Sequence, residues 1–260
     1  MSELTNDERH TKRLEIEPII FNILKEKYLD MLKHFWNSYI VPKYSNKAIV
    51  IIERRIHPNL EFILYNAAYF ARGWTIVIVC SNINKEYIKS LLNHNMDNVY
   101  ILEMFKDNPS PEIGKREYNL LLQSKHFYEA LPSEHILLME MDTYLRNHIP
   151  LNLLEFDYVA SPYVWDETVS GGGLSLRKKS TMIHICNTCL QLDLIQDIYA
   201  CNGIKALGYT MPSFEEGITY FAESCHYEDP IGVHQWWTFW NPDDSDDSNL
   251  IFKEYTTLMV

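Results

Sequence analysis

Hydrophobic residues follow two kinds of spacing along this chain. In residues 18–39 apolar side chains recur every three or four positions, which predicts one long amphipathic helix that begins near Pro18 and ends before Pro42. The polar residues 1–13 are expected to be frayed. The apolar face of this helix must pack against another surface, which is either the same domain or a second molecule.

From residue 48 onward, short continuous apolar runs alternate with segments of helical spacing. Continuous β-branched runs predict strands that are buried on both faces. Their alternation with helices is typical of an α/β fold with a mainly parallel sheet, in which ligands bind at the carboxyl ends of the strands. The expected strands are 48–52, 75–80, 99–102 and 135–139, and the expected helices are 60–70, 85–92, 117–130 and 179–193.

Composition narrows the class of protein. A chain of 260 residues with 47% hydrophobic residues supports the core of one large globular domain. The formal net charge of −12 disfavours a general nucleic-acid binder. The first residues lack the apolar core of a signal peptide, and no apolar run reaches the roughly 18 residues of a membrane span. Five cysteines, mostly in apolar surroundings, are typical of reduced thiols, so we expect a cytoplasmic location.

The most informative motif follows the strand expected at 135–139. Glu140 and Asp142 are two positions apart, so on an extended chain their side chains point the same way while Met141 turns into the core. Mg²⁺ and Mn²⁺ prefer oxygen ligands, commonly carboxylates together with substrate phosphates. The pair is therefore a candidate cation site. A solvated strand end, or Asp142 capping the next turn, explains the same residues without a metal.

Three later features are also candidates, each with a simpler alternative. The run Gly171, Gly172 and Gly173 permits positive φ and suits either close approach of a ligand or a sharp turn into the following strand. His234, beside two tryptophans, is either a late metal ligand or a hydrogen-bonded core histidine. Asp197 is either a general base or a helix-capping residue.

Several short motifs occur in a specific order, at 53–61, 118–122, the strand ending in Asp142, 156–162, 172–177, 212–216 and 232–234. Together they resemble a glycosyltransferase-like family of uncharacterised function with the GT-A fold, over about residues 47–240. The resemblance implies a single GT-A-like, Rossmann-like α/β domain at 47–260. Within it, 47–142 would be the nucleotide-binding half and 143–260 the acceptor half. Residues 1–46 would form an N-terminal tail and helical extension.

The resemblance also implies an activity. Such a protein would use Mn²⁺ or Mg²⁺ to move a sugar from a nucleotide-diphosphate donor, with a UDP-sugar expected, to a hydroxyl of a glycan or another acceptor, with inversion. Glu140, Asp142 and His234 would hold the cation. Asp197 would deprotonate the acceptor, whereas an Asp197 that lies far from the donor would favour retention instead. The residues implied to contact the donor follow the first two strands or form the glycine run: Glu53, Arg54, Arg55, Ser81, Asn82, Gly171, Gly172 and Gly173.

Several positions depart from the pattern of that family. Glu140 stands where many GT-A enzymes have Asp, Gln196 where the family has Glu, Gly171 where it has Asn, and Gln235-Trp236-Trp237 where it has Lys-Pro-Trp. A catalytically degenerate domain that binds a sugar nucleotide is therefore an open alternative. Another is an assembly module in which the N-terminal helix forms a homodimer, although dimerisation is also compatible with catalysis.

Overall fold

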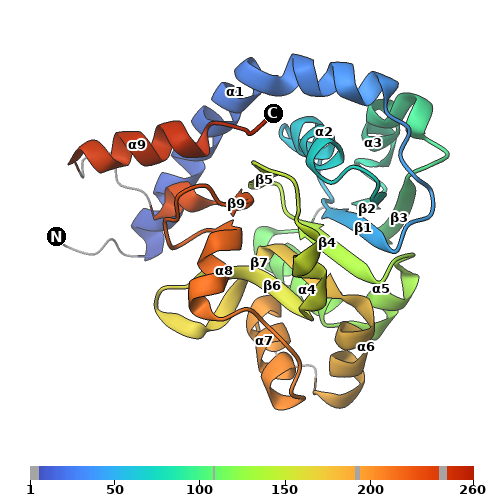
Figure 1. Ribbon diagram of the computed structural model, residues 1–260. Helices are drawn as coiled ribbons and strands as arrows, with labels where there is room; N and C mark the ends of the chain where they lie inside the picture. Colours follow the sequence, from blue (N-terminus) through green and yellow to red (C-terminus); the bar gives the residue numbers. More distant parts are fainter. Residues whose placement is uncertain (1–5, 108, 191–193, 240–244) are drawn as a thin grey trace.

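The computed structural model describes residues 6–107, 109–190, 194–239 and 245–260 (Figure 1). In this part of the chain, a six-stranded sheet contains β1 (Lys47–Ile52), β2 (Thr75–Ser81), β3 (Tyr100–Phe105), β4 (His135–Met139), β6 (Tyr158–Tyr163) and β7 (Asp166–Lys178). Its order is β3-β2-β1-β4-β7-β6. The first four strands run parallel, and β7 is antiparallel to both of its neighbours. The predicted mainly parallel α/β sheet is confirmed.

Helices cover both faces of this sheet. In β1, Ile49 and Ile51 pack into the core on one face, whereas Val50 and Ile52 pack into the core on the other. This two-sided burial explains why the strand is a continuous apolar run rather than an alternating one. One core includes side chains of α2 (Leu60–Phe70) and α3 (Lys85–Leu92), and the other includes side chains of α4 (Pro111–Leu122), α5 (Lys125–Ala130), α6 (Lys179–Thr188) and α7 (Gln196–Ala206).

A smaller sheet lies beyond the carboxyl end of β4. It pairs β5 (Thr143–Leu145) with β9 (Gly232–His234) in antiparallel fashion, and β9 with β8 (Phe221–Ala222) in parallel. The β5–β9 pairing brings two distant parts of the chain to the same edge of the large sheet. The remaining elements are α8 (Phe214–Tyr220), α9 (Ser245–Tyr255) and the short 3₁₀ helices η1 (Asn93–Asn95), η2 (Leu151–Glu155) and η3 (Trp236–Thr238).

The first helix, α1 (Asn6–Ser38), is longer than predicted and packs on its own chain (Figure 1). The predicted start near Pro18 is wrong, and so is the expected fraying for residues 6–13; residues 1–5 lie outside the described part. Tertiary contacts made by Arg13 and Ile16 support the early turns, a signal that local spacing does not carry. Among residues 11–38 of α1, the fully buried side chains are Ile20, Phe21, Leu24, Leu32 and Trp36. None of the described helices, α1 included, is both long and apolar enough to cross a membrane.

Two other boundaries differ from the sequence expectation. The single helix predicted at 117–130 is broken at Ser124, whose backbone is extended, so that α4 and α5 are separate helices. The helix predicted at 179–193 ends at Thr188, and residues 191–193 lie outside the described part. The glycine run does not form a sharp turn: it lies inside β7, and none of its three residues has positive φ.

Candidate metal centre and adjoining cavity

The acidic pair lies at the carboxyl end of β4, next to the small sheet. The backbone N–H of Glu140 donates to the carbonyl of Gly173 on β7 at 2.9 Å, and Thr143 Oγ1 donates to the carbonyl of Glu140 at 2.8 Å. These bonds shape the tight connection between β4 and β5. Met141 is buried in the core, as its position in the motif predicts, and Asp142 is buried beside the cavity.

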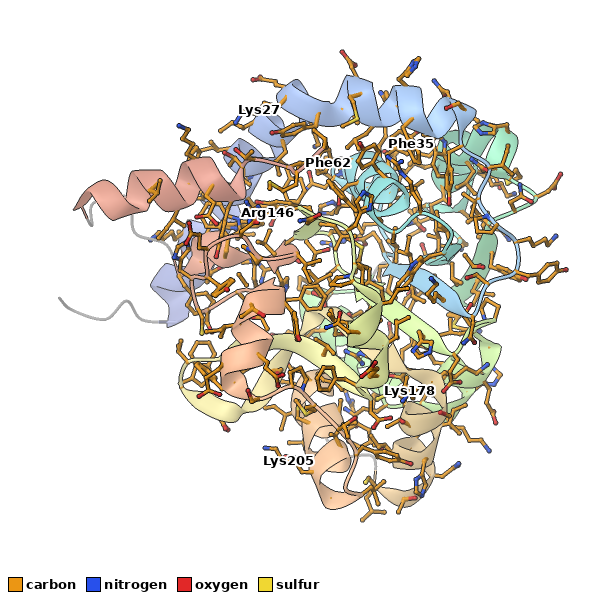
Figure 2. All side chains as sticks on the ribbon, in the orientation of Figure 1. Lys27, Phe35, Phe62, Arg146, Lys178 and Lys205 are labelled. Atoms are coloured by element: carbon orange, nitrogen blue, oxygen red, sulfur yellow. The ribbon has the colours of Figure 1, made fainter. Side chains whose placement is uncertain are left out.

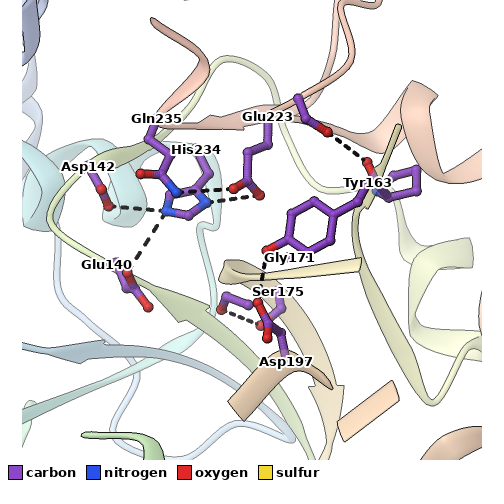
Figure 3. Close-up of polar contacts among 12 residues, drawn as sticks. Glu140, Asp142, Tyr163, Gly171, Ser175, Asp197, Glu223, His234 and Gln235 are labelled. Carbon is purple, nitrogen blue, oxygen red and sulfur yellow. Dashed lines mark hydrogen bonds and ion pairs between the residues drawn. The ribbon is translucent and has the colours of Figure 1, made fainter. Parts of the chain in front are cut away.

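His234 reaches this acidic pair through the pairing of β9 with β5. Thr143 and His234 are register partners, and the N–H of Gln235 donates to the carbonyl of Asp142 at 3.0 Å. His234 Nε2 therefore lies 3.3 Å from Asp142 Oδ1 and 3.9 Å from Glu140 Oε2 (Figure 3). One ligand atom from each of the three residues lies within 4.8 Å of the other two. The structure thus brings together the three side chains that the sequence singled out as cation ligands.

The residues at this point have the chemistry of a cation site. Both ring nitrogens of His234 are buried and lie near carboxylates, yet neither makes a hydrogen bond of good geometry. Buried polar atoms without such bonds are uncommon in proteins. Two carboxylates and one imidazole form a mixed oxygen and nitrogen donor set that suits Mn²⁺, and the carboxylates suit Mg²⁺. The donor set therefore fits the divalent cation that the sequence implies.

Electrostatics at the site favour a positive charge. Burial raises the pKa of Glu140, and the nearby Asp142 carboxylate raises it further. Burial acts to raise the pKa of Asp142, but His234 and Arg13 outweigh it and hold this pKa below its usual range. Burial acts to lower the pKa of His234, but Glu223 and Asp142 raise it well above its ordinary value. Without a metal, a protonated imidazole is thus stabilised among these carboxylates, and a cation bound at Nε2 would replace that proton.

Glu223, directly after β8, is a site residue that the sequence analysis missed. Its Oε2 lies 3.1 Å from His234 Nδ1, on the side of the ring opposite Asp142 (Figure 3). Its Oε1 accepts a hydrogen bond from Gln235 Nε2 at 3.1 Å. Carboxylates in this position orient the rings of metal-ligating histidines. The sequence analysis missed Glu223 because a single Glu after a two-residue strand forms no recognisable motif.

A cavity of about 590 Å³ adjoins the acidic pair, a size typical of small-molecule sites. The cationic residues lining it include Arg54 and Arg55, as expected from their place after β1. Arg54 Nη1 lies 2.6 Å from Glu117 Oε2, and its guanidinium lies 3.9 Å from the centroid of the Phe105 ring. The guanidinium of Arg55 makes two hydrogen bonds to Glu53, at 2.9 and 2.8 Å. Two guanidinium groups of fixed orientation, each paired with a carboxylate, therefore line the cavity.

Ser81 and Asn82, expected to contact a nucleotide, do not line this cavity. Ser81 is buried, and its Oγ donates to the carbonyl of Arg54 at 2.6 Å. Asn82 is exposed. Asn84, which the sequence analysis did not single out, donates to the carbonyls of Glu53 and Arg55 at 2.8 and 2.9 Å. Ser81 and Asn84 therefore shape the loop that carries the cavity arginines.

The three consecutive glycines in β7 let functional side chains pass close to the strand. A Cβ at Gly171 would overlap the carboxylate of Glu223, and a Cβ at Gly173 would overlap the ring of His234. On the other face, a Cβ at Gly172 would overlap the amide of Gln196. The requirement for glycine here is space for neighbouring side chains, not an unusual backbone angle.

Asp197 and Gln196 lie in the first turn of α7 and do not line the cavity. Asp197 Oδ2 accepts a hydrogen bond from Tyr163 Oη at 2.9 Å, and burial raises the pKa of this carboxyl. Gln196 Oε1 accepts from the buried guanidinium of Arg177 at 2.5 Å. The structure therefore gives Asp197 a hydroxyl partner away from the cavity, and it gives Gln196 a structural role.

These features define an α/β protein with a candidate divalent-cation site at the carboxyl edge of its sheet. The chain belongs to a family described as proteins of unknown function (DUF5672), whose model matches residues 102–234. That segment includes all three candidate cation ligands. No curated protein gives a significant match.

Among solved structures, the chain is similar to the apo-form glycosyltransferase GlyE of Streptococcus pneumoniae TIGR4. The two share 10% sequence identity with a TM-score of 0.47, over 81% of this chain and 63% of the GlyE chain. This chain thus spans less than two thirds of the length of that protein.

Proposed function

We propose that this protein is a metal-dependent glycosyltransferase of the GT-A type, which transfers a sugar from a nucleotide-diphosphate donor to an acceptor hydroxyl. A UDP-sugar is the donor expected, and a glycan is one suitable acceptor. The observation that carries the proposal is the convergence of Glu140, Asp142 and His234 beside a cavity of about 590 Å³. Ligands of α/β sheets bind at this carboxyl edge, which supports the assignment.

The cation ligands are held in place by neighbouring residues. Tyr118 Oη donates to Glu140 Oε1 at 2.6 Å, while Oε2 of the same carboxylate faces His234. Glu223 holds the opposite side of the His234 ring. A bound Mn²⁺ or Mg²⁺ supplies Lewis-acid stabilisation of negative charge on a leaving diphosphate. The task of these residues is to present one oxygen or nitrogen each toward a common point.

The arginines after β1 support the diphosphate part of the proposal. Arg54 Nη2 is buried without a hydrogen-bond partner, and the guanidinium is fixed by Glu117 and by the ring of Phe105. Arginine donors with a fixed orientation suit phosphate oxygens. We assign Arg54 and Arg55 to the binding of the donor diphosphate in this cavity.

The residue expected to accept the proton, Asp197, lies outside the cavity lining. Asp197 was expected to deprotonate the acceptor, yet its carboxylate accepts hydrogen bonds from Tyr163 and from the backbone of Ile198, and it does not line the cavity. Inversion through Asp197 therefore requires the acceptor to approach from the side of Tyr163.

The proposal is tested by donor turnover in the wild type and in Asp142→Asn. With Mn²⁺ and a panel of UDP- and GDP-sugars, we expect slow hydrolysis of one donor by the wild type and a loss of at least about 100-fold in the variant. Asp97→Asn is the matched control because Asp97 is exposed and lies outside the cavity lining. Equal turnover by the wild type and Asp142→Asn would contradict the mechanism, whereas donor binding without turnover would favour the degenerate alternative.

A further inference from the structure

Arg13 connects the first helix to the candidate metal centre. Its Nη2 lies 2.7 Å from Asp142 Oδ2, across 129 positions of the sequence. The Arg13 side chain is 34% exposed, whereas that of Asp142 is 5% exposed. Arg13 also lines the cavity together with Glu17 of the same helix. An N-terminal segment expected to be frayed therefore contributes a charged group to the site.

The two oxygens of the Asp142 carboxylate have different neighbours. Oδ1 faces His234 Nε2 at 3.3 Å, and Oδ2 holds the guanidinium of Arg13 at 2.7 Å. A divalent cation bound by Asp142 and His234 would therefore share the Asp142 carboxylate with Arg13. Like charges on one buried carboxylate repel each other strongly, because the local dielectric constant is low. Arg13 should therefore oppose the binding of a cation that arrives alone.

A diphosphate would offset the repulsion between Arg13 and the cation. The cavity guanidinium groups of Arg54 and Arg55 are paired with Glu117 and Glu53, which are not candidate cation ligands. The carboxylate partner of Arg13 is itself a candidate ligand, and Arg13 Nε is buried without a hydrogen-bond partner. When a cation also binds the Asp142 carboxylate, the negative charge of Asp142 no longer neutralises Arg13 fully. Phosphate oxygens that enter the same cavity would supply the missing negative charge next to Arg13.

We propose that Arg13 couples cation binding to nucleotide-diphosphate binding. It weakens the binding of the cation alone and strengthens the binding of the diphosphate together with the cation. This inference rests on the proposed function and deepens it, because it adds a residue of the N-terminal helix to the donor site and makes occupancy by metal conditional on the donor.

The test is calorimetric titration of Mn²⁺ into the full chain, with and without UDP, for the wild type and Arg13→Gln. The variant should bind Mn²⁺ alone more tightly and UDP with Mn²⁺ more weakly than the wild type. The factor by which UDP raises the affinity for Mn²⁺ should fall by about tenfold, within the usual range of coupling between sites. Because the base of the nucleotide is open, the titrations are repeated with GDP.

Two variants separate the charge of Arg13 from general effects of mutation. Lys27 lies at an exposed position of α1 (Figure 2), and its Nζ donates to the carbonyl of Thr256. Lys27→Gln removes the same charge there and should leave the coupling unchanged. Arg13→Lys keeps the charge and should retain the direction of the coupling. If Arg13→Gln does not fold, Arg13→Met, which keeps the aliphatic stem, takes its place.

Opposite shifts of the two affinities in Arg13→Gln would support the inference. Shifts in the same direction, or none, would overturn it and leave Arg13 as a structural partner of Asp142. If the wild type binds Mn²⁺ and the nucleotide, and the coupling between them is unchanged in Arg13→Gln, this inference alone is overturned. A wild type that binds neither UDP nor GDP in the presence of Mn²⁺ would overturn the proposed function and this inference with it.

Discussion

At the scale of single residues, the candidate site depends on how the His234 ring is held. Glu223 occupies the Nδ1 side at 3.1 Å, which leaves Nε2 facing Glu140 and Asp142. A carboxylate partner fixes the orientation of an imidazole and raises its basicity as a ligand. Glu223 therefore acts as a positioning residue, because it reaches the cation site through His234.

Glu223→Gln tests this role. We expect the affinity for Mn²⁺ to fall by about 10- to 100-fold, the usual cost of losing such a partner, because a neutral amide holds the ring less firmly. Direct titration with Mn²⁺ measures the change, and Glu228→Gln, at an exposed position nearby, is the control. An unchanged affinity, even with a lowered melting temperature, would show that Glu223 has only a structural role.

The residues found from the sequence were those with a local signal. Glu140 and Asp142 stood out because two acids at i and i+2 follow an apolar strand, and that spacing can be read directly. His234 has no such spacing: the sequence left a metal ligand and a core histidine as alternatives, and the family resemblance implied the ligand. Arg13 and Glu223 were missed because their roles arise from contacts with Asp142 and His234, which only the folded chain brings together.

At the scale of elements, the site constrains the sequence of β7. Its glycines leave room for side chains from β9, α7 and the segment after β8. The buried strands were readable from their continuous apolar runs, since burial on both faces leaves that pattern in the sequence. The sequence left close approach and a sharp turn as alternatives for the glycine run, because the same residues serve tight turns and close packing.

Gly173→Ala should displace the His234 ring, since the added Cβ would overlap it, and weaken Mn²⁺ binding by at least about tenfold. Gly114→Ala is a matched control at the cavity wall. There the added Cβ would meet its nearest atoms at 3.8 and 3.9 Å, an ordinary contact, and alanine in this helix should raise stability by about 0.5–1 kcal/mol. Mn²⁺ titration and urea unfolding measure both effects. Normal metal affinity in Gly173→Ala would refute this account of β7.

At the scale of the whole molecule, α1 joins the core to the cavity. Its apolar side chains pack beside α2, while Arg13 and Glu17 line the cavity. Burial raises the pKa of Glu17 to about 7, and the nearby charge of Asp142 contributes to the increase. The contribution of Glu17 to the free energy of unfolding should therefore decrease as the pH rises from about 4.5 to about 7.

Glu17→Gln removes this titration. The variant should be more stable than the wild type at pH 8, and the difference should shrink at pH 5, where the native carboxyl of the wild type is protonated. Urea unfolding of the metal-free protein at the two pH values measures it, with Glu26→Gln, at an exposed position of α1, as the control. A stability gain of equal size at pH 5 and pH 8 would show that the ionisation of Glu17 has no such effect.

The central claim is that Glu140, Asp142 and His234 bind one divalent cation next to a nucleotide diphosphate. Crystals grown with Mn²⁺ and UDP test it directly, because anomalous scattering locates manganese independently of any assumption about the site. The account predicts the strongest anomalous peak among these three side chains, with UDP in the adjoining cavity. Manganese bound elsewhere, or UDP bound away from this cavity, would contradict it.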